Sequence, residues 1–432
     1  MGLVNNILYI SNFILPIVTL ARRLRKKEGI EVDHIFLFSC GFIFYLILPI
    51  VLAGTKPFVL YSGYPKWKLL FDAIPDSTWT VYFVACLLLY TSFLAGDFFS
   101  GKFYKKKILR KYHFDKKLVY VFLTIAISLA IFSGYPMRSY FFAGYSISTQ
   151  IPMLGSFTAA AILLLSVAFM YSGKVREEFR VSMPFWKTIL NPCFIAYFIV
   201  ATLLFSMGGR MIFISSLLML MVFYSVYFKR LRLSYLILLF LLIIYLAHFI
   251  VIFREGYVRT FLTRLDIKSI AIYLFPENFS VSFSLLDFLS KYSIPILRFP
   301  TNLLSGLVSI IPSFVFPTKA SFIISRDDLG YAVQSPFGGM NAFVTLMVNF
   351  GIIGSMMFLS FISFFLRKWK DNPSIPYSAM YILTSGWLAL MFFRDTEQTL
   401  TKEILQFAIL TPLVIATVSS KLNSSAVVIT KS

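Results

Sequence analysis

"SYLILLFLLIIYLAHFIVIF", residues 234–253, contains no Lys, Arg, Asp or Glu. A helix needs about 20 mostly apolar residues to cross the ~30 Å hydrocarbon core of a bilayer. The run therefore predicts a membrane-spanning helix. Directly after it, "REGYVRTFLTR" (254–264) places Arg254, Arg259 and Arg264 around a single Glu255. Three guanidinium groups where an apolar helix ends need an explanation of their own.

The composition of the whole chain supports a membrane protein. Of its 432 residues, 58% are hydrophobic and only 14% are charged, and the mean hydropathy is +0.80. This is more apolar surface than one soluble core hides. The three Cys lie in separate apolar runs and the three His lie far apart, so no disulfide framework, metal site or cofactor is expected.

The same length criterion predicts an all-α, polytopic integral membrane protein with about eleven transmembrane helices. The predicted spans are 3–21, 34–54, 78–96, 118–134, 155–172, 191–207, 211–227, 234–253, 339–366, 376–393 and 403–419. They divide the chain into three parts. These are eight spans in 1–253, a large structured outer loop in 254–338, and three spans with a tail in 339–432.

Basic residues are unevenly shared between the two sets of connections. One set, with "RRLRKK" (22–27) and "KFYKKKILRKYHFDKK" (102–117), holds 25 Lys and Arg, whereas the other holds 7 outside its long loop. The positive-inside rule makes the first set cytoplasmic. The N-terminus is then periplasmic and the C-terminus cytoplasmic. These basic runs set orientation near anionic lipids, so nucleic acid is not expected as a partner.

The outer loop carries charges that orientation does not explain. It holds 8 basic and 6 acidic residues and is too long for a plain connection. "SIAIYLFPENFSVSFSLLDFLSKY" (269–292) has near-helical apolar spacing. "LLSGLVSIIPSFVFP" (303–317) is short and broken by prolines, which favours a re-entrant or interface-lying segment. We expect a lid on the outer face of the bundle.

Several outer-face residues could bind an anion, and each also has a plain structural explanation. Arg210 follows two glycines in "FSMGGRMIF", where it either meets a phosphate or ends a tight turn. Arg259 lies four residues after Glu255, the spacing of a helical ion pair. Arg138 lies in an aromatic loop (133–148) that equally suits a sugar or a membrane interface. Lys319 follows two prolines in a rigid turn.

The outer-face carboxylates are the candidates for a general base. No spacing singles one out, and for each a solvated loop charge is the simpler interpretation. The candidates are Glu255, Asp327, Asp328 and Asp395, with Arg394 and Glu397 nearby in "FRDTEQTLTKE" (393–403).

Four pieces in this order resemble the Wzy-type O-antigen (oligosaccharide repeat-unit) polymerases of bacterial inner membranes. They are "GGR" (208–210), the aromatic loop around Arg138, "IPSFVFPTK" (311–319) and "SPFGGMNAFVTLMVNFGIIG" (335–354). Thr345 stands where members often carry an acidic residue. Related O-antigen ligases have a His where this chain has Met340, although Asn341, Gly351 and Gly354 keep the ligase spacing.

The resemblance implies a glycosyltransferase that joins undecaprenyl-pyrophosphate-linked repeat units at the outer face during lipopolysaccharide synthesis. Donor and acceptor lipids, membrane lipids and a chain-length regulator protein would be its partners. Pyrophosphate-binding residues would be Arg210, Arg254, Arg264, Lys319, Arg138 and, more weakly, Arg259. An O-antigen flippase or other transporter of lipid-linked oligosaccharide, and an O-antigen ligase, are the alternatives. Scarce mid-span charge and no clear internal repeat favour the enzyme over a transporter.

Overall fold

The computed structural model describes most of the chain as helices. The described residues are 3–24, 29–53, 70–103, 116–141, 151, 153–179, 184–207, 210–254, 276–311, 316–335, 339–372, 374–394, 397 and 399–429. Within these ranges there is no strand, only one isolated bridge between Ile30 and Leu231. The predicted all-α class is confirmed for this part of the chain.

Seven described helices are long and apolar enough to cross a membrane, so the chain is a polytopic membrane protein. They are Val4–Leu24, His34–Val51, Asp76–Lys102, Lys117–Gly134, Leu154–Glu177, Ala342–Lys370 and Thr399–Ser420. The other four predicted spans fall on the helices α10 (Pro192–Ser206), α11 (Arg210–Tyr227), α12 (Leu233–Arg254) and α17 (Ile375–Ala389). The count of eleven spans stays a prediction.

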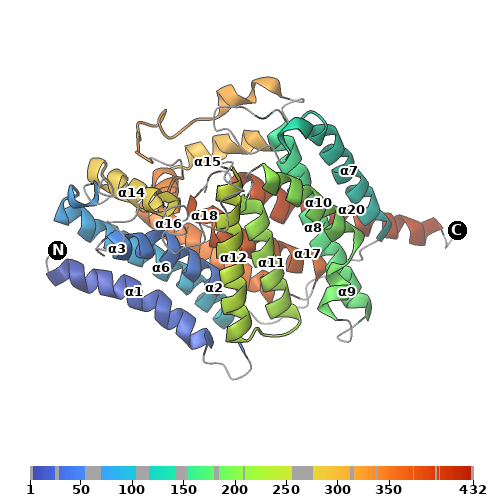
Figure 1. Ribbon diagram of the computed structural model, residues 1–432, viewed down its shortest axis with the longest axis horizontal. Coiled ribbons are helices and arrows are strands. Elements are labelled where there is room, and N and C mark those ends of the chain that lie inside the picture. The colour runs from blue at the N-terminus through green and yellow to red at the C-terminus, as the bar shows by residue number, and fades with distance from the viewer. Residues whose placement is uncertain are drawn as a thin grey trace.

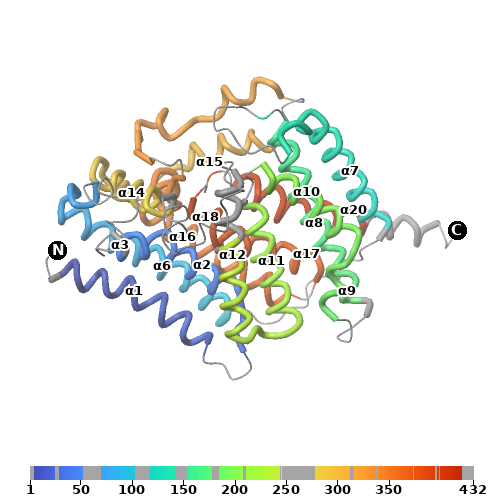
Figure 2. Tube along the Cα trace, in the orientation of Figure 1, coloured from blue at the N-terminus to red at the C-terminus, as the bar shows by residue number. Residues whose placement is uncertain are grey.

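The remaining elements complete the bundle (Figures 1 and 2). In chain order they are α1 (Leu3–Leu24), α2 (His34–Phe42), the π-helix η1 (Ile43–Ile47), α3 (Leu48–Ala53), α6 (Asp76–Phe103), α7 (Lys116–Gly134), the 3₁₀ turn η2 (Arg138–Tyr140), α8 (Leu154–Phe179), α9 (Phe185–Ile189), α14 (Pro276–Lys291), α15 (Thr301–Gly306), the 3₁₀ turns η6 (Leu307–Ile310) and η7 (Pro317–Phe322), α16 (Ala342–Lys370), α18 (Met391–Arg394), the π-helix η8 (Thr399–Leu410) and α20 (Thr411–Ile429). We call the end with α15 and η7, at the top of Figure 1, the loop end, and the opposite end the basic end.

Helices α6 and α16 pack against each other more extensively than any other pair of described elements. A Cβ added at Gly96 would lie 2.0 Å from the carbonyl oxygen of Ser360, so only glycine permits this approach. The Ser360 hydroxyl donates to the Ser92 carbonyl at 2.7 Å. Small residues that let two backbones meet are the usual means of packing helices in a bilayer, where apolar side chains gain little from association.

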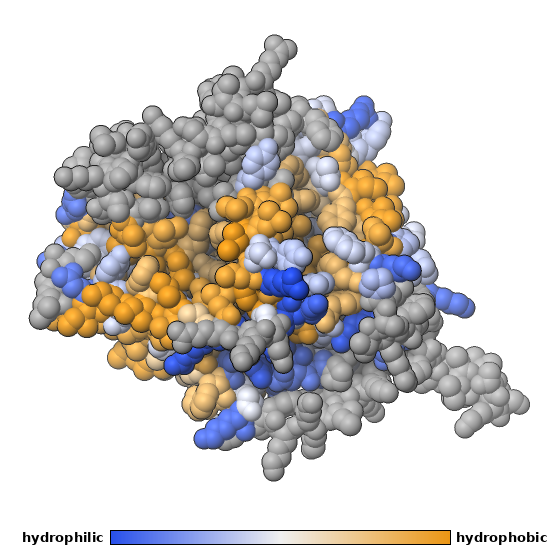
Figure 3. All heavy atoms as spheres, turned by 60° about the horizontal axis from the view of Figure 1, so that its bottom comes forward, coloured by the Kyte–Doolittle hydropathy of each residue, from blue (hydrophilic) through white to orange (hydrophobic). Residues whose placement is uncertain are grey.

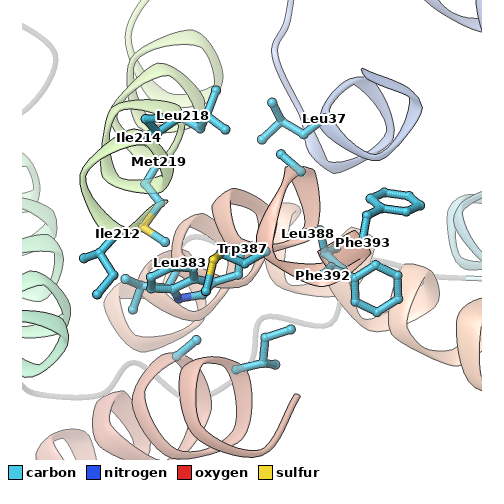
Figure 4. Close-up of a cluster of buried hydrophobic side chains, with 14 of the residues drawn as sticks. Leu37, Ile212, Ile214, Leu218, Met219, Leu383, Trp387, Leu388, Phe392 and Phe393 are labelled. Carbon is cyan, nitrogen blue, oxygen red and sulfur yellow. The ribbon is translucent and has the colours of Figure 1, made fainter. Parts of the chain in front are cut away.

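Buried apolar side chains also join α2, α11, α17 and α18. Trp387 and Phe393 are fully buried among them. Figure 4 shows Met219 of α11 beside Trp387 of α17. Phe392 and Phe393 of α18 lie on the other side of Trp387 from Met219. These side chains fix α17 and α18, which precede Glu397 and the start of η8 at the loop end.

Helix α16 is interrupted at Gly351, which has φ 71° and ψ −178°. This backbone region is accessible essentially only to glycine. At the break, residues of the predicted outer loop supply the missing backbone partners. Ile352 and Ile353 donate to the carbonyls of Pro295 and Ile296 at 2.9 and 3.1 Å, and Arg298 N donates to the Phe350 carbonyl at 3.0 Å. The Asn-Phe-Gly sequence (349–351) therefore docks the loop onto the bundle.

We predict that Gly351→Ala destabilises the protein by about 1–3 kcal/mol, because the backbone conformation is unfavourable for any residue with a Cβ. The added Cβ would also lie 2.6 Å from the Pro295 carbonyl oxygen. Thermal unfolding in detergent measures the effect. Gly155→Ala, whose Cβ meets no atom within 4 Å, is the matched control and should leave the midpoint unchanged or raise it. Equal midpoints for the two variants would refute the docking role of Gly351.

Helix α14 lies inside the bundle, although its sequence belongs to the predicted outer loop. Its residues from Asn278 to Phe288 are buried. Asn278 Nδ2 and Ser282 Oγ donate to the carbonyls of Phe44 and Tyr45 at 3.2 and 2.6 Å, in the π-helix η1. A π-helix disturbs the regular backbone ladder, so partners from another helix satisfy its carbonyls. The buried part of the predicted outer loop is therefore the segment 278–288. The re-entrant or interface-lying position that we expected for 303–317 stays a prediction.

The basic end is held together by ion pairs. Asp33 begins α2 by accepting from Phe36 N at 3.0 Å, and its carboxylate also meets Arg23 and Lys370. Lys370 pairs in addition with Glu31. Figure 3 brings this end forward and shows hydrophilic side chains gathered near its middle, with apolar side chains on either side. Some of the basic residues that predict orientation therefore also join α1, α2 and α16.

Candidate functional site

A group of charged and amide side chains from distant segments meets at the loop end. Here η6 packs against η8, and η7 packs against η6. We call Asn302, Lys319, Arg326, Glu397 and Lys402 the loop-end cluster. It combines three cations and one carboxylate at the loop end of the bundle.

Two buried asparagines fix the geometry of this cluster. Asn349 of α16 accepts from Leu303 N at 2.9 Å through Oδ1, and its Nδ2 donates to Asn302 Oδ1 at 3.1 Å. Asn302 Nδ2 donates to the Ile324 carbonyl at 2.7 Å. The two amides hold α15 and the segment before Arg326 in fixed positions on α16, because each buried amide has defined partners.

Arg326 and Glu397 form the ion pair at the centre of the cluster. Arg326 Nε lies 3.8 Å from Glu397 Oε1. The Glu397 side chain is 42% exposed as a whole, but Oε1 itself and Arg326 Nη1 are buried and have no hydrogen bond among the described residues. A buried polar group without a hydrogen bond costs about 1–3 kcal/mol. Such groups are uncommon in folded proteins and are found at functional sites.

The surroundings of the Glu397 carboxyl act on its pKa in opposite directions, and the net effect is to raise it. Burial raises its pKa, although the nearby Arg326 guanidinium and the Asn302 amide act in the opposite direction. Its backbone carbonyl accepts from the Thr401 hydroxyl at 2.7 Å, which fixes it to the first turn of η8. A carboxylate with a raised pKa accepts a proton more readily near neutral pH than an ordinary glutamate does.

Lys319 and Lys402 are the cations of the cluster that form no ion pair with a carboxylate among the described residues. Lys319 Nζ donates to the carbonyls of Ile311 at 2.5 Å and Ser309 at 3.3 Å. Partial burial and the charge of Lys402 lower the pKa of Lys319. Two ammonium groups that repel each other favour an anion between them, since it stabilises the charged form of both.

The structure places Arg210 and Arg254 at neighbouring helix ends. Arg210 begins α11 and Arg254 ends α12, and the two antiparallel helices pack side by side, so both residues lie at the loop end. Their side chains lie outside the described part of the structure. Four further candidates, with both backbone and side chain, also lie outside it: Glu255, Arg259, Arg264 and Asp395.

The other candidates lie on exposed turns. Arg138 is exposed and lies over the Tyr135 ring, 4.3 Å from its centroid. Asp327 is exposed as well. Asp328 accepts from Ser325 N at 2.8 Å and from its hydroxyl at 2.7 Å, and these bonds lower the pKa of Asp328. A lowered pKa makes a weaker base, so Asp328 suits a turn-stabilising role better than a catalytic one.

Lys402 is a site residue that the sequence patterns did not propose, and Glu397 was only one of several outer-face carboxylates among which no spacing decided. Their partners come from residues 302–326, so no local spacing connects them. A carboxylate just before an apolar run was the only available signal. Among the described residues, no three His, Cys, Asp or Glu side chains gather in a group that could hold a metal ion.

Comparison with protein-family models, with curated proteins and with solved structures found no match to this chain.

Proposed function

We propose that this chain is a membrane glycosyltransferase of the O-antigen polymerase type, which joins lipid-linked oligosaccharide repeat units. The observation that carries the proposal is the loop-end cluster. It places a carboxyl with a raised pKa beside Arg326, with Lys319 and Lys402 nearby, at one end of an apolar bundle. A base and several cations beside a membrane are what sugar transfer from a lipid pyrophosphate requires.

In the proposed reaction, the hydroxyl of the acceptor sugar attacks the anomeric carbon of the donor. The new bond between that oxygen and carbon forms as the bond from carbon to the pyrophosphate oxygen breaks. The hydroxyl proton passes to Glu397, and the electron pair leaves with the lipid pyrophosphate. Arg326 keeps Glu397 in place through their contact, and this ion pair also favours the ionised form of the base.

The cations act on the leaving group. Lys319 and Lys402, together with Arg210 and Arg254 at the adjoining helix ends, would stabilise the negative charge that develops on the pyrophosphate. In this proposal the basic end faces the cytoplasm and the loop end faces the periplasm of a bacterial inner membrane, since Lys and Arg concentrate on the cytoplasmic side. The sugar chain would then grow on the outer face.

We expect Lys319→Ala and Lys402→Ala each to lower polymer yield roughly 10- to 100-fold, because a hydrogen bond to a charged group contributes about 1.5–3 kcal/mol. The measurement is the lipopolysaccharide ladder on gels, in cells that make the cognate repeat unit and lack their own polymerase. Lys187→Ala is the control, because Lys187 is exposed on α9 at the basic end. Full-length ladders from both cluster variants would argue against pyrophosphate binding at this position.

A further inference from the structure

An apolar groove of about 300 Å³ lies between α2, η1, α11 and α12. One of its walls is a row on α11 at helical spacing, from Met211 through Ile214 and Leu218 to Met221. Figure 4 shows Leu37 of α2 facing Ile214 and Leu218 of α11. The row covers about three helical turns, or about 15 Å at 1.5 Å per residue. The groove is therefore long and narrow.

The lining of the groove suits hydrocarbon and not water. Among its lining residues, Asn278 alone carries a side-chain amide, and that amide already donates to the Phe44 carbonyl. An ordered water needs two to four polar partners, and beyond Asn278 the side chains of these walls offer only the Tyr45 hydroxyl and the Cys40 thiol. On the α12 side, Ile237 and Leu241 are 51% and 58% exposed, so the groove opens sideways along α12 toward the surrounding lipid.

One end of the groove points toward the loop end, where the loop-end cluster lies. Its wall includes Ala389 and Leu390, and the chain continues from there into α18 and on to Glu397. Met211 of the wall directly follows Arg210, where α11 begins at the loop end. An amphiphile with its chain in the groove would thus have its polar group beside the proposed catalytic residues. The groove and the cluster together match a molecule with one long apolar chain and an anionic head.

We propose that this groove holds the isoprenoid chain of the lipid-linked donor, in an orientation that presents its pyrophosphate to the loop-end cluster. The inference rests on the proposed function for the identity of the lipid. The position proposed for the isoprenoid chain is argued from the lining and the course of the groove itself. By holding the isoprenoid chain, the groove would fix the position of the attached pyrophosphate. It would thereby orient the anomeric carbon of the donor sugar.

The test is photo-crosslinking of the purified protein with a polyprenyl phosphate that carries a diazirine in its chain, followed by peptide mapping. We expect adducts on 36–45 and 211–221 that excess unlabelled polyprenyl phosphate removes and phosphatidylglycerol does not. Cys40→Phe, which adds volume at a partly exposed lining residue, should lower these adducts at least 10-fold. Ile237→Trp, at the open side of the groove, is the second blocking variant.

Ile199→Phe is the control, because Ile199 is 60% exposed on α10 and does not line the groove. Adducts spread over exposed helix faces, or equal competition by phosphatidylglycerol, would overturn the inference. Unchanged groove adducts in both blocking variants would overturn it as well. Crosslinking requires no turnover. Groove adducts without polymer would therefore sink only the proposed reaction, and polymer without groove adducts would sink only this inference.

Discussion

Glu397→Gln should lower polymerisation by at least about 100-fold, within the 10²–10⁴-fold range typical for loss of a general base. Glutamine keeps the size and the planar geometry of the side chain but is not basic enough to accept a proton from the acceptor hydroxyl. Membrane insertion should be unaffected, since the side chain is two-fifths exposed and belongs to no apolar core. Ladder length in cells and single-turnover rates of the purified protein both measure the effect.

The pH dependence of the rate gives an independent check. A base works as its carboxylate, so activity falls as the pH drops through its pKa. Because burial raises the pKa of Glu397, this fall should begin at a higher pH than the ordinary glutamate value of about 4.3 implies. Asp328→Asn, on an exposed turn, is the matched control and should keep near-normal activity. A fully active Glu397→Gln variant would exclude Glu397 as the base.

Asp33→Ala should be the most destabilising of the single substitutions considered, at about 3–5 kcal/mol, the range for breaking one side of a buried ion pair. Asp33 is 1% exposed and meets Lys370 at 3.1 Å as well as Arg23. Its loss leaves two partly buried cations without this carboxylate and removes the cap from α2. Asp33→Asn should be less harmful, because Asn can still cap the helix. Unfolding in detergent measures both.

The sign of the pH effect follows from the same contacts. Burial opposes the charged form of Asp33, but Lys370 and Arg23 outweigh it and lower its pKa. The stabilisation is therefore complete at neutral pH and is lost only as the pH falls below about 4, the unfolded value. Glu177→Ala, at a half-exposed pair with Lys174, is the control and should cost no more than about 1 kcal/mol. Equal losses in Asp33→Ala and Glu177→Ala would contradict the buried network.

The helical membrane fold was predictable because it depends on the apolar content of long runs. The span 118–134, for example, coincides with α7 (Lys116–Gly134) to within two residues. The interruption at Gly351 was not predictable, because it depends on backbone partners at Pro295 and Ile296. The burial of α14 also escaped the sequence patterns. Asn278 and Ser282 of α14 donate to carbonyls of η1, and only the fold brings these two segments together.

The site was predictable only in part. Lys319 stood out because two prolines precede it, and the structure places it in the loop-end cluster beside Lys402. Glu397 lies in a stretch with several charges, and only the fold shows which of them meets Arg326. Charges that pair across distant segments produce no periodic pattern in the sequence. The pair between Arg326 and Glu397 could therefore be identified only from the three-dimensional structure.

The most direct test is to incubate the purified protein with lipid-linked repeat units alone and to analyse the products by mass spectrometry. We predict lipid-linked glycans of two and more repeat units, with release of free lipid pyrophosphate, and neither product from Glu397→Gln. Repeat units that stay covalently unchanged but cross the bilayer of a vesicle would indicate a transporter. Transfer that occurs only onto added lipid A core would indicate a ligase. Either of these last two results would contradict the proposed polymerase.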